Sequence, residues 1–397
     1  MSSAPPFVFH RRVLAERIAT SALGLDPFSP REVSVFLAAP RRTGKSTFLV
    51  EDLLPELRAR KAVPVYVDLW SNKAEDPGVM IRNAVRKVLE EQGNRMLRHV
   101  RRTGLTKAGI GSWLSFDLDR LGMAGGATLA DGLAALARKT AGSVVVVVDE
   151  AQHAVTSEAG REAMFALKSA RDTINLDGSL KRKDNTATLG LVFTGSHRDK
   201  LASLVIGRDQ PFFGSRVSDF PPLGRDYTDA YCRHVNGLLA PDRAIDPDEM
   251  AEAFQIVGHR PQYLYDAVSR YALGEMGRDV PASSLADLAR EERETHWETY
   301  RTQWSGLDAI QQAVLRRVVE EGDRFRPFDA ESVAAYSAAV AEAVSVRDAQ
   351  QALDQLRDMS LVVRLERGRY ALDDPSFSEW LKSTETAEPS AGPGTGP

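Results

Sequence analysis

The segment from Ala39 to Ser46 places glycine, lysine and serine at the spacing of a phosphate-binding loop. It fits the pattern G-x-x-x-x-G-K-[ST], with alanine at the first glycine position, and it directly follows an apolar run. The backbone N–H groups of such a loop, together with the positive end of the following helix, cradle phosphates. Lys45 adds a positive charge, and the Ser46 hydroxyl is a ligand for Mg²⁺. We therefore predict a P-loop for ATP and Mg²⁺, with the binding residues Ala39, Pro40, Arg41, Arg42, Thr43, Gly44, Lys45, Ser46 and Thr47.

Two adjacent carboxylates, Asp149 and Glu150, follow five consecutive valines. An apolar run without alternation is typical of a strand that is buried on both faces of a sheet. At the end of such a strand Asp149 would hold the Mg²⁺, and Glu150 would orient the attacking water. The alternative is a strand-end carboxylate that caps the next helix. Because the same chain carries a P-loop, we favour Mg²⁺-dependent ATP hydrolysis, with Lys45 and Glu150 as catalytic residues.

Polar residues also follow the apolar run from Leu189 to Phe193. Thr194 and Ser196 could sense the γ-phosphate, and Arg198 could do so as a charge. An equally weighted alternative makes Ser196 the N-cap of a following helix. Arg216 is a further candidate for γ-phosphate contact, in cis or across a subunit interface, and a plain surface arginine is its alternative.

These residues need a scaffold that brings strand ends together. The first 220 residues alternate apolar, β-branched runs with amphipathic stretches, which predicts an α/β fold with a parallel sheet. The expected strands are 33–38, 63–68, 144–148, 189–193 and 216–220, and the expected helices are 45–60, 77–102, 129–140 and 158–175.

The remainder of the chain is predicted to be helical, with a hairpin near its end. Residues 224–300 form helices broken at Pro241, at 258–261 and at Pro281, and three helices followed by strands at 362–366 and 370–372 describe a winged helix. The predicted domains are a P-loop ATPase domain at 1–223, a helical lid at 224–304, a winged helix at 305–385 and a disordered tail at 386–397.

Composition narrows the class of protein. The 397 residues are 43% hydrophobic and 27% charged, with a net charge of -4, as in ordinary globular proteins. Cys232 is the single cysteine, which excludes an intramolecular disulfide and a multi-cysteine metal site. No apolar run approaches the roughly 20 residues of a membrane span, and no signal peptide is recognisable, so we expect a cytoplasmic protein without a membrane partner.

The motifs together resemble the AAA+/STAND-type ATPases, and more narrowly the prokaryotic archaeal-type ATPases that are related to origin-recognition ATPases. The resemblance rests on residues 39–46, 147–152, 191–196 and 213–216 in this order, and on Gly258-His-Arg-Pro261. It implies that Pro261 packs on the adenine in a helical lid and that the segment from Phe7 to Arg12 lies over the base. An equally weighted alternative makes that segment a hydrophobic staple with a solvated pair of arginines. Three features depart from the family: Phe213 replaces a tyrosine, two residues separate Gly258 from Pro261, and the usual sensor asparagine is absent.

The resemblance implies a slow switch that couples nucleotide state to the winged helix, and two kinds of output stay open. Residues 1–110 hold 19 Lys and Arg against 11 Asp and Glu, which suggests an anionic partner. Four arginines at helical spacing form a basic stripe that could contact DNA: Arg95, Arg98, Arg101 and Arg102. The winged helix, with its recognition helix at 346–359, could contact DNA as well. The alternative is a signalling or scaffold switch that docks a protein partner or forms a homo-oligomer. A small-molecule kinase is disfavoured because no acceptor site is recognisable.

Overall fold

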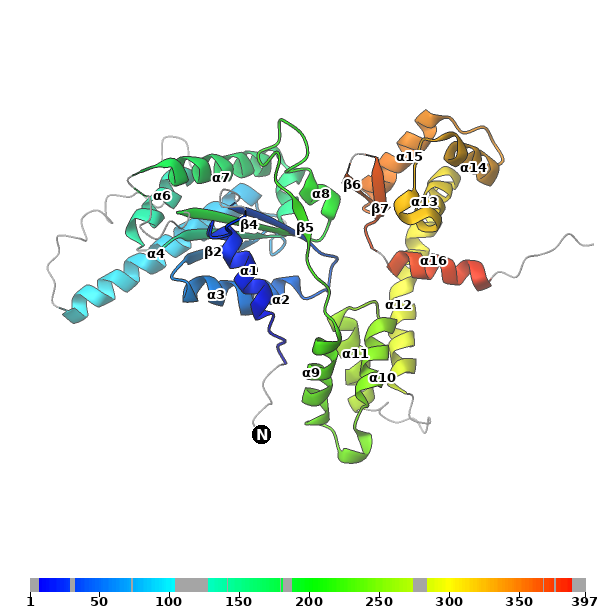
Figure 1. The fold of residues 1–397 in the computed structure, drawn as a ribbon, viewed down its shortest axis with the longest axis horizontal. Helices are drawn as coiled ribbons and strands as arrows, with labels where there is room; N and C mark the ends of the chain where they lie inside the picture. The colour runs from blue at the N-terminus through cyan, green and yellow to red at the C-terminus, as the bar shows by residue number, and fades with distance from the viewer. Residues whose placement is uncertain are drawn as a thin grey trace, which may run out of the picture.

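The fold is taken from a computed structural model of the chain (Figure 1). It describes residues 7–28, 33–72, 74–103, 128–140, 142–178, 180, 188–273, 284–366, 368–374 and 376–387. The break predicted at Pro281 and most of the predicted tail lie outside these residues. In the part of the chain that is described, no helix is long and apolar enough to cross a membrane.

A five-stranded parallel sheet forms the core of the first part of the chain, which confirms the predicted α/β class. Its strands are β1 (Ser34–Ala38), β2 (Val63–Asp68), β3 (Val144–Asp149), β4 (Leu189–Gly195) and β5 (Val217–Asp219), in the order β2-β3-β4-β1-β5. Ala38 pairs with Gly195, and Asp68 pairs with Asp149. The carboxyl ends of the strands therefore meet at one edge, where the P-loop begins.

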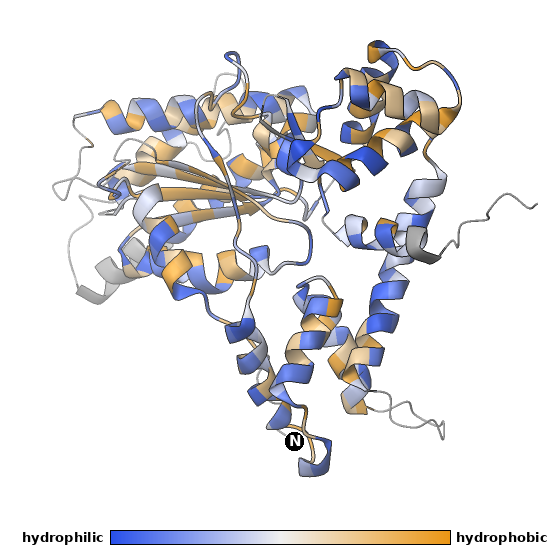
Figure 2. Cartoon of the chain, turned by 45° about the vertical axis from the view of Figure 1, so that its right-hand side comes forward, coloured by the Kyte–Doolittle hydropathy of each residue, from blue (hydrophilic) through white to orange (hydrophobic). Residues whose placement is uncertain are grey.

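The valine run of β3 serves two cores at once, because successive side chains point to opposite faces of the sheet. Val144, Val146 and Val148 pack with helices α4 (Pro77–Thr103), α6 (Leu129–Lys139) and α7 (Glu158–Leu176). Val145 and Val147 pack with α1 (Arg12–Ala22) and with the helices after the P-loop. Figure 2 shows the apolar strands between two helical layers.

The helix after the P-loop is interrupted, although the sequence predicts one helix over 45–60. It consists of α2 (Lys45–Phe48), a π-helical turn at Leu49–Leu53 and α3 (Leu54–Ala59). Pro55 lacks an N–H group, so the regular ladder loses a bond there, which favours a wide turn just before it. The buried Asp52 of this turn accepts hydrogen bonds from His10 Nδ1 at 2.7 Å and from the Arg11 backbone N–H at 2.9 Å. The turn thereby fastens the N-terminal segment to the P-loop helix.

A helical bundle follows the sheet. It contains α9 (Arg225–Asn236), a 3-10 turn at Pro241–Arg243, α10 (Pro247–Ile256), α11 (Pro261–Leu273) and the first part of α12 (Leu285–Ser305). Phe7 packs on this bundle, with its ring 5.1 Å from that of Tyr231. The N-terminal segment therefore contacts both the sheet domain and the bundle.

The last part of the chain has the predicted three helices and hairpin. These are α13 (Ala309–Glu321), α14 (Ala330–Val340), α15 (Val346–Asp358), β6 (Val362–Glu366) and β7 (Arg369–Leu372). A further helix, α16 (Ser376–Ala387), extends two residues into the predicted disordered tail, because Phe377, Trp380 and Leu381 pack in the core of this unit.

Helix α12 joins the bundle to the winged helix without a break (Figure 1). Its Leu285 and Leu288 lie in the bundle core, whereas Trp297 and Tyr300 lie in the core of the winged helix. The predicted boundary between residues 304 and 305 falls at the last residue of this helix, so one rigid element belongs to both units.

Candidate functional site

The P-loop runs from the end of β1 to the start of α2, as the spacing predicts. Gly44 has a φ of +84°, and its hypothetical Cβ would have free space, so backbone conformation alone demands glycine there. Arg42 is also left-handed, at a φ of +65°. The Thr43 hydroxyl donates to the carbonyl of Pro40 at 2.8 Å. The loop encloses a cavity of about 310 Å³, lined by Pro40, Arg41, Arg42, Gly44, Lys45, Ser46, Thr47, Trp70 and Glu150.

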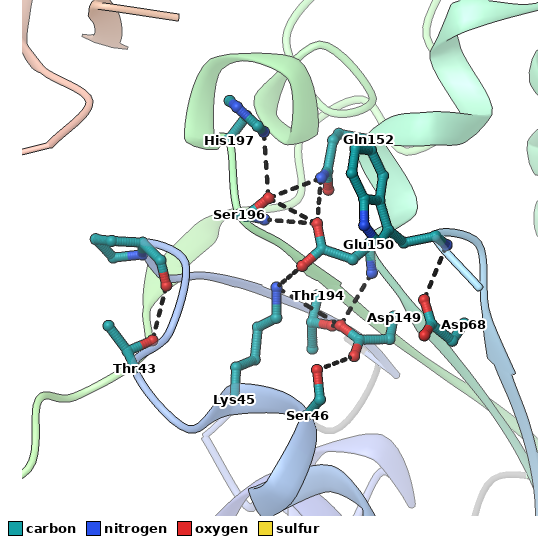
Figure 3. A network of polar contacts seen from close by, with 12 residues as sticks. Thr43, Lys45, Ser46, Asp68, Asp149, Glu150, Gln152, Thr194, Ser196 and His197 are labelled. Atoms are coloured by element: carbon teal, nitrogen blue, oxygen red, sulfur yellow. Dashed lines mark hydrogen bonds and ion pairs between the residues drawn. The ribbon is translucent and has the colours of Figure 1, made fainter. Parts of the chain in front are cut away.

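Asp149 lies at the centre of the site and is fully buried. One carboxylate oxygen, Oδ2, accepts a hydrogen bond from the Ser46 hydroxyl at 2.6 Å. The other accepts from the Thr194 hydroxyl, and Lys45 Nζ lies 3.6 Å from it (Figure 3). A carboxylate and a hydroxyl side by side are the hard oxygen ligands that Mg²⁺ prefers. The two residues predicted to bind Mg²⁺ therefore lie together and have suitable chemistry.

Glu150 contacts Lys45 and carries backbone strain. Lys45 Nζ lies 2.6 Å from Glu150 Oε1, and the Ser196 hydroxyl donates to Oε2 at 2.6 Å. The φ of Glu150 is +54°, a left-handed conformation that side chains rarely adopt and that concentrates at functional sites. Burial alone would raise the pKa of this carboxyl, but Lys45, Ser196 and Gln152 lower it to about 2. Glu150 is therefore ionised throughout the neutral range.

The polar residues at the end of β4 and just after it divide into two groups. Thr194 and Ser196 face the two carboxylates described above. Arg198 instead turns to β5, where it pairs with Asp219 and donates to the carbonyl of Val217 at 3.0 Å. Ser196 is not the N-cap of the next helix, because α8 (Arg198–Ala202) begins two residues after Ser196 and its N-cap is His197. The structure thus brings two of the three proposed sensors to the acidic pair.

Arg216 and Pro261 lie apart from the P-loop cavity. Arg216 is exposed just before β5. Pro261 begins α11 and lines a different cavity, of about 720 Å³, together with Phe7 and Tyr231. The side chains of Arg95, Arg98, Arg101 and Arg102 lie outside the described residues, although their backbone belongs to α4.

Neighbours of Pro261 face the P-loop in its place, and sequence reasoning missed them. Arg42 Nη1 donates to the Tyr263 hydroxyl at 2.7 Å. Arg260 and Tyr263 line a cavity of about 350 Å³ with Arg41 and Arg42. The turn before them needs two consecutive left-handed residues, Gly258 at +66° and His259 at +55°. The glycine is the only part of this turn that the sequence signals.

Trp70 is a second residue that the sequence did not single out. It follows β2 at the same edge of the sheet, and the Arg41 guanidinium lies 4.8 Å from its ring centroid. The ring of His153 lies 4.4 Å from that of Trp70. The position of Trp70 just after the end of a predicted strand was the sequence signal that could have identified it as a residue of the site. Trp70 therefore forms one wall of the P-loop cavity.

Comparison with known proteins identifies solved structures that share the fold of this chain. No protein-family model matches the sequence, and no curated protein does. Among solved structures, the Walker-type ATPase PABY2304 of Pyrococcus abyssi is 16% identical with a TM-score of 0.58, covering 94% of this chain and 96% of its own. The Aeropyrum pernix ORC2 protein in its ADP form is 16% identical with a TM-score of 0.57, covering 97% and 96%. The same protein in ADPNP-ADP complexes gives 16% identity, a TM-score of 0.53, and coverage of 98% and 97%.

The structural similarity extends over nearly the whole chain. At 16% sequence identity it establishes the fold. They agree with the archaeal-type, origin-recognition-related part of the sequence resemblance and give no support to its STAND part. The chain has the α/β P-loop fold of the AAA+ type, followed by a helical lid and a C-terminal winged helix.

Proposed function

We propose that this protein binds ATP with Mg²⁺ and hydrolyses it slowly, as a switch whose nucleotide state sets the position of the winged helix. The observation that carries the proposal is the pairing of Lys45 with Glu150 and of Ser46 with Asp149 at the mouth of the P-loop. The Aeropyrum pernix ORC2 protein, which shares the fold, has been captured with ADP and with ADPNP.

The side chains around the cavity divide the work of hydrolysis. The backbone of residues 40–45 and Lys45 bind the phosphates, and Thr194 holds Asp149 in place. Ser46 and Asp149 would hold Mg²⁺, which neutralises charge on the phosphates when it is bound. Incoming phosphates attract Lys45 away from Glu150, which leaves the Oε1 atom of Glu150 available to accept a hydrogen bond from the attacking water. Each of these roles uses an atom that already lies at the cavity.

A chain of polar contacts supports the coupling of this site to the winged helix. It starts at Arg42 of the P-loop and continues through Tyr263, whose hydroxyl lies 2.9 Å from His296 Nδ1 on α12. Tyr300, one turn further along α12, donates to Asp374 Oδ2 at 2.6 Å, and Asp374 follows the hairpin of the winged helix. Because α12 is continuous, a movement of the P-loop arginine has a direct route to the winged helix.

Domain roles follow from this route. Residues 1–223 would act as the ATPase domain, 224–304 as the lid and 305–385 as the responding winged helix. Pro261 would act through the turn that presents Arg260 and Tyr263. Arg216, which is exposed just before β5, would reach the γ-phosphate of a neighbouring copy, which makes a homo-oligomer part of the proposal. Arg198 would position β5 through Asp219.

The output that we propose is association with DNA. On the recognition helix α15, Arg347, Gln350 and Gln351 are all exposed, and the first 110 residues carry the excess of positive charge. Contacts to phosphates would make binding fall steeply with salt. Arg98→Ala with Arg101→Ala should weaken binding and reduce the salt slope, whereas an unchanged affinity and slope would exclude the stripe.

A protein partner is the second candidate, and two observations favour it. The same helix exposes three carboxylates, Asp348, Asp354 and Asp358, which DNA would repel. Near its C-terminal end, Arg357 Nε already donates to Asp199 Oδ2 of α8 at 2.7 Å, so this end packs on the ATPase domain. Absence of DNA binding at low salt with ATP present would favour this candidate.

Turnover tests the proposed function. Wild-type protein should release phosphate from ATP only with Mg²⁺, and Asp149→Ala should lose this dependence together with activity. Glu150→Gln should bind ATP and stop turnover. Full activity of Glu150→Gln would refute the role given to Glu150, and turnover that is indifferent to Asp149 would refute the Mg²⁺ site.

A further inference from the structure

The two carboxylate oxygens of Glu150 have different partners. Oε1 faces the cavity and contacts only Lys45 among the described residues, at 2.6 Å. Oε2 points away and accepts from the Ser196 hydroxyl at 2.6 Å and from Gln152 Nε2 (Figure 3). One oxygen therefore has a partner that nucleotide would remove, and the other has partners that belong to the rigid sheet edge.

Gln152 is the less expected of these partners. It lies in the 3-10 turn Ala151–Thr156 directly after Glu150, and it is 1% exposed. Its Nε2 also lies 3.0 Å from the Ser196 hydroxyl, so three side chains form a closed triangle. Its own Oε1 is buried and has no hydrogen-bond partner among the described residues. An unpaired buried oxygen is costly, so the amide donor at this point must offset that cost.

Strand β4 is shaped to admit this amide. A Cβ atom at Gly195 would come within 2.6 Å of Gln152 Oε1, closer than any side chain tolerates. Glycine at the end of a buried strand weakens the strand and often marks a close approach. Here the approaching group is the Gln152 amide. Two positions on different elements therefore serve the same contact with Glu150.

We propose that Gln152 is a positioning residue for hydrolysis: with Ser196 it fixes Oε2 of Glu150, so that Oε1 keeps its place at the cavity after Lys45 moves to the phosphates. The inference rests on the proposed ATPase function. A carboxylate held at one oxygen has its free oxygen aimed in one direction, whereas an unheld carboxylate would follow Lys45 or rotate. Since small misplacements of a catalytic group cost large factors in rate, the effect falls on turnover.

Two variants test the proposal in the full-length chain. Gln152→Leu removes the donor, and Gly195→Ala displaces the amide while keeping it. Each should lower kcat on the order of 10- to 100-fold, with the ATP dissociation constant unchanged within twofold. Matched controls are Gln311→Leu, another buried glutamine but in the winged helix, and Gly178→Ala, where a Cβ meets open space. Both controls should keep the kcat of the wild type.

A double-mutant comparison separates positioning from general damage. In a Glu150→Gln background, Gln152→Leu should change the residual turnover less than twofold, because a residue that acts through Glu150 has nothing left to position. An equal loss in both backgrounds, or a loss of ATP affinity that parallels the loss of kcat, would overturn the proposal. If Gln152→Leu does not fold, Gly195→Ala carries the same comparison. A wild type that neither binds nor hydrolyses ATP would instead refute the proposed function, and the inference with it.

Discussion

Replacing Glu150 by glutamine should strengthen ATP binding as well as stop turnover. In the structure Lys45 is paired with Glu150 at 2.6 Å, and the two side chains are only 6% and 16% exposed. ATP must compete with this pair for the same ammonium group. Glu150→Gln removes the competing charge but keeps an oxygen for Ser196. Lys45 is then free to bind the phosphates without breaking an ion pair.

The pKa of Glu150 sets the size of the effect. A fall from 4.5 to about 2 corresponds to about 3 kcal/mol of net stabilisation of the ionised form. Lys45 shares this with Ser196 and Gln152, and the burial of the carboxyl opposes it. If Lys45 accounts for about half of this stabilisation, removing its ion pair with Glu150 is worth roughly 1.4 kcal/mol in ATP binding. This corresponds to about a tenfold change in the dissociation constant of ATP.

Isothermal titration with a non-hydrolysable ATP analogue measures this change. Glu162→Gln, an exposed glutamate on α7, is the matched control and should bind like the wild type. Glu150→Gln should bind about ten times more tightly. Affinity equal to or below that of the wild type would show that the pair of Lys45 and Glu150 does not compete with nucleotide.

Three further predictions concern the junction between lid and winged helix. Asp374→Ala leaves the buried Arg260 guanidinium (7% exposed) unpaired, so the free energy of unfolding in urea should fall by about 2–3 kcal/mol, less than for a fully buried pair; a loss below about 0.5 kcal/mol would contradict this. Burial and the nearby carboxylates raise the pKa of Asp373 to about 7, so its protonated form stabilises the fold below pH 4 and this contribution is lost as the pH rises to 7. Asp373→Asn should therefore be more stable than the wild type at pH 8, by up to about 4 kcal/mol, and equal stability at pH 8 would argue against it. Gly258→Ala should cost more thermal stability than Gly368→Ala, because both have positive φ but only the first would place a Cβ 2.8 Å from a neighbouring side chain; equal melting temperatures would contradict the contact.

The strands and the centre of the site could be read from sequence because their signals are local. Five valines without alternation mark a strand buried on both faces, and Asp149 and Glu150 follow it directly. The P-loop is also a local pattern. Parallel pairing of β1 with β4 and of β4 with β3 then aligns the strand ends, so the meeting of Ser46 with Asp149 follows from topology.

The remaining features depend on partners that are distant in sequence. Arg198 turns away from the cavity because Asp219, 21 residues later, lies within reach. Tyr263 contacts Arg42 across 221 residues, a proximity that only the packing of the lid determines. The π-helical turn contains Asp52, which accepts a hydrogen bond from the Arg11 backbone N–H, 41 residues earlier in the chain.

Binding of ATP·Mg²⁺ to the full-length chain, measured by calorimetry for the wild type and for Lys45→Ala, tests the central claim most directly. The P-loop geometry predicts saturable binding by the wild type at one site per chain, and loss of that binding when the ammonium group is removed. Equal binding by the two proteins, or no binding by the wild type, would contradict the assignment of residues 39–47 as the nucleotide site.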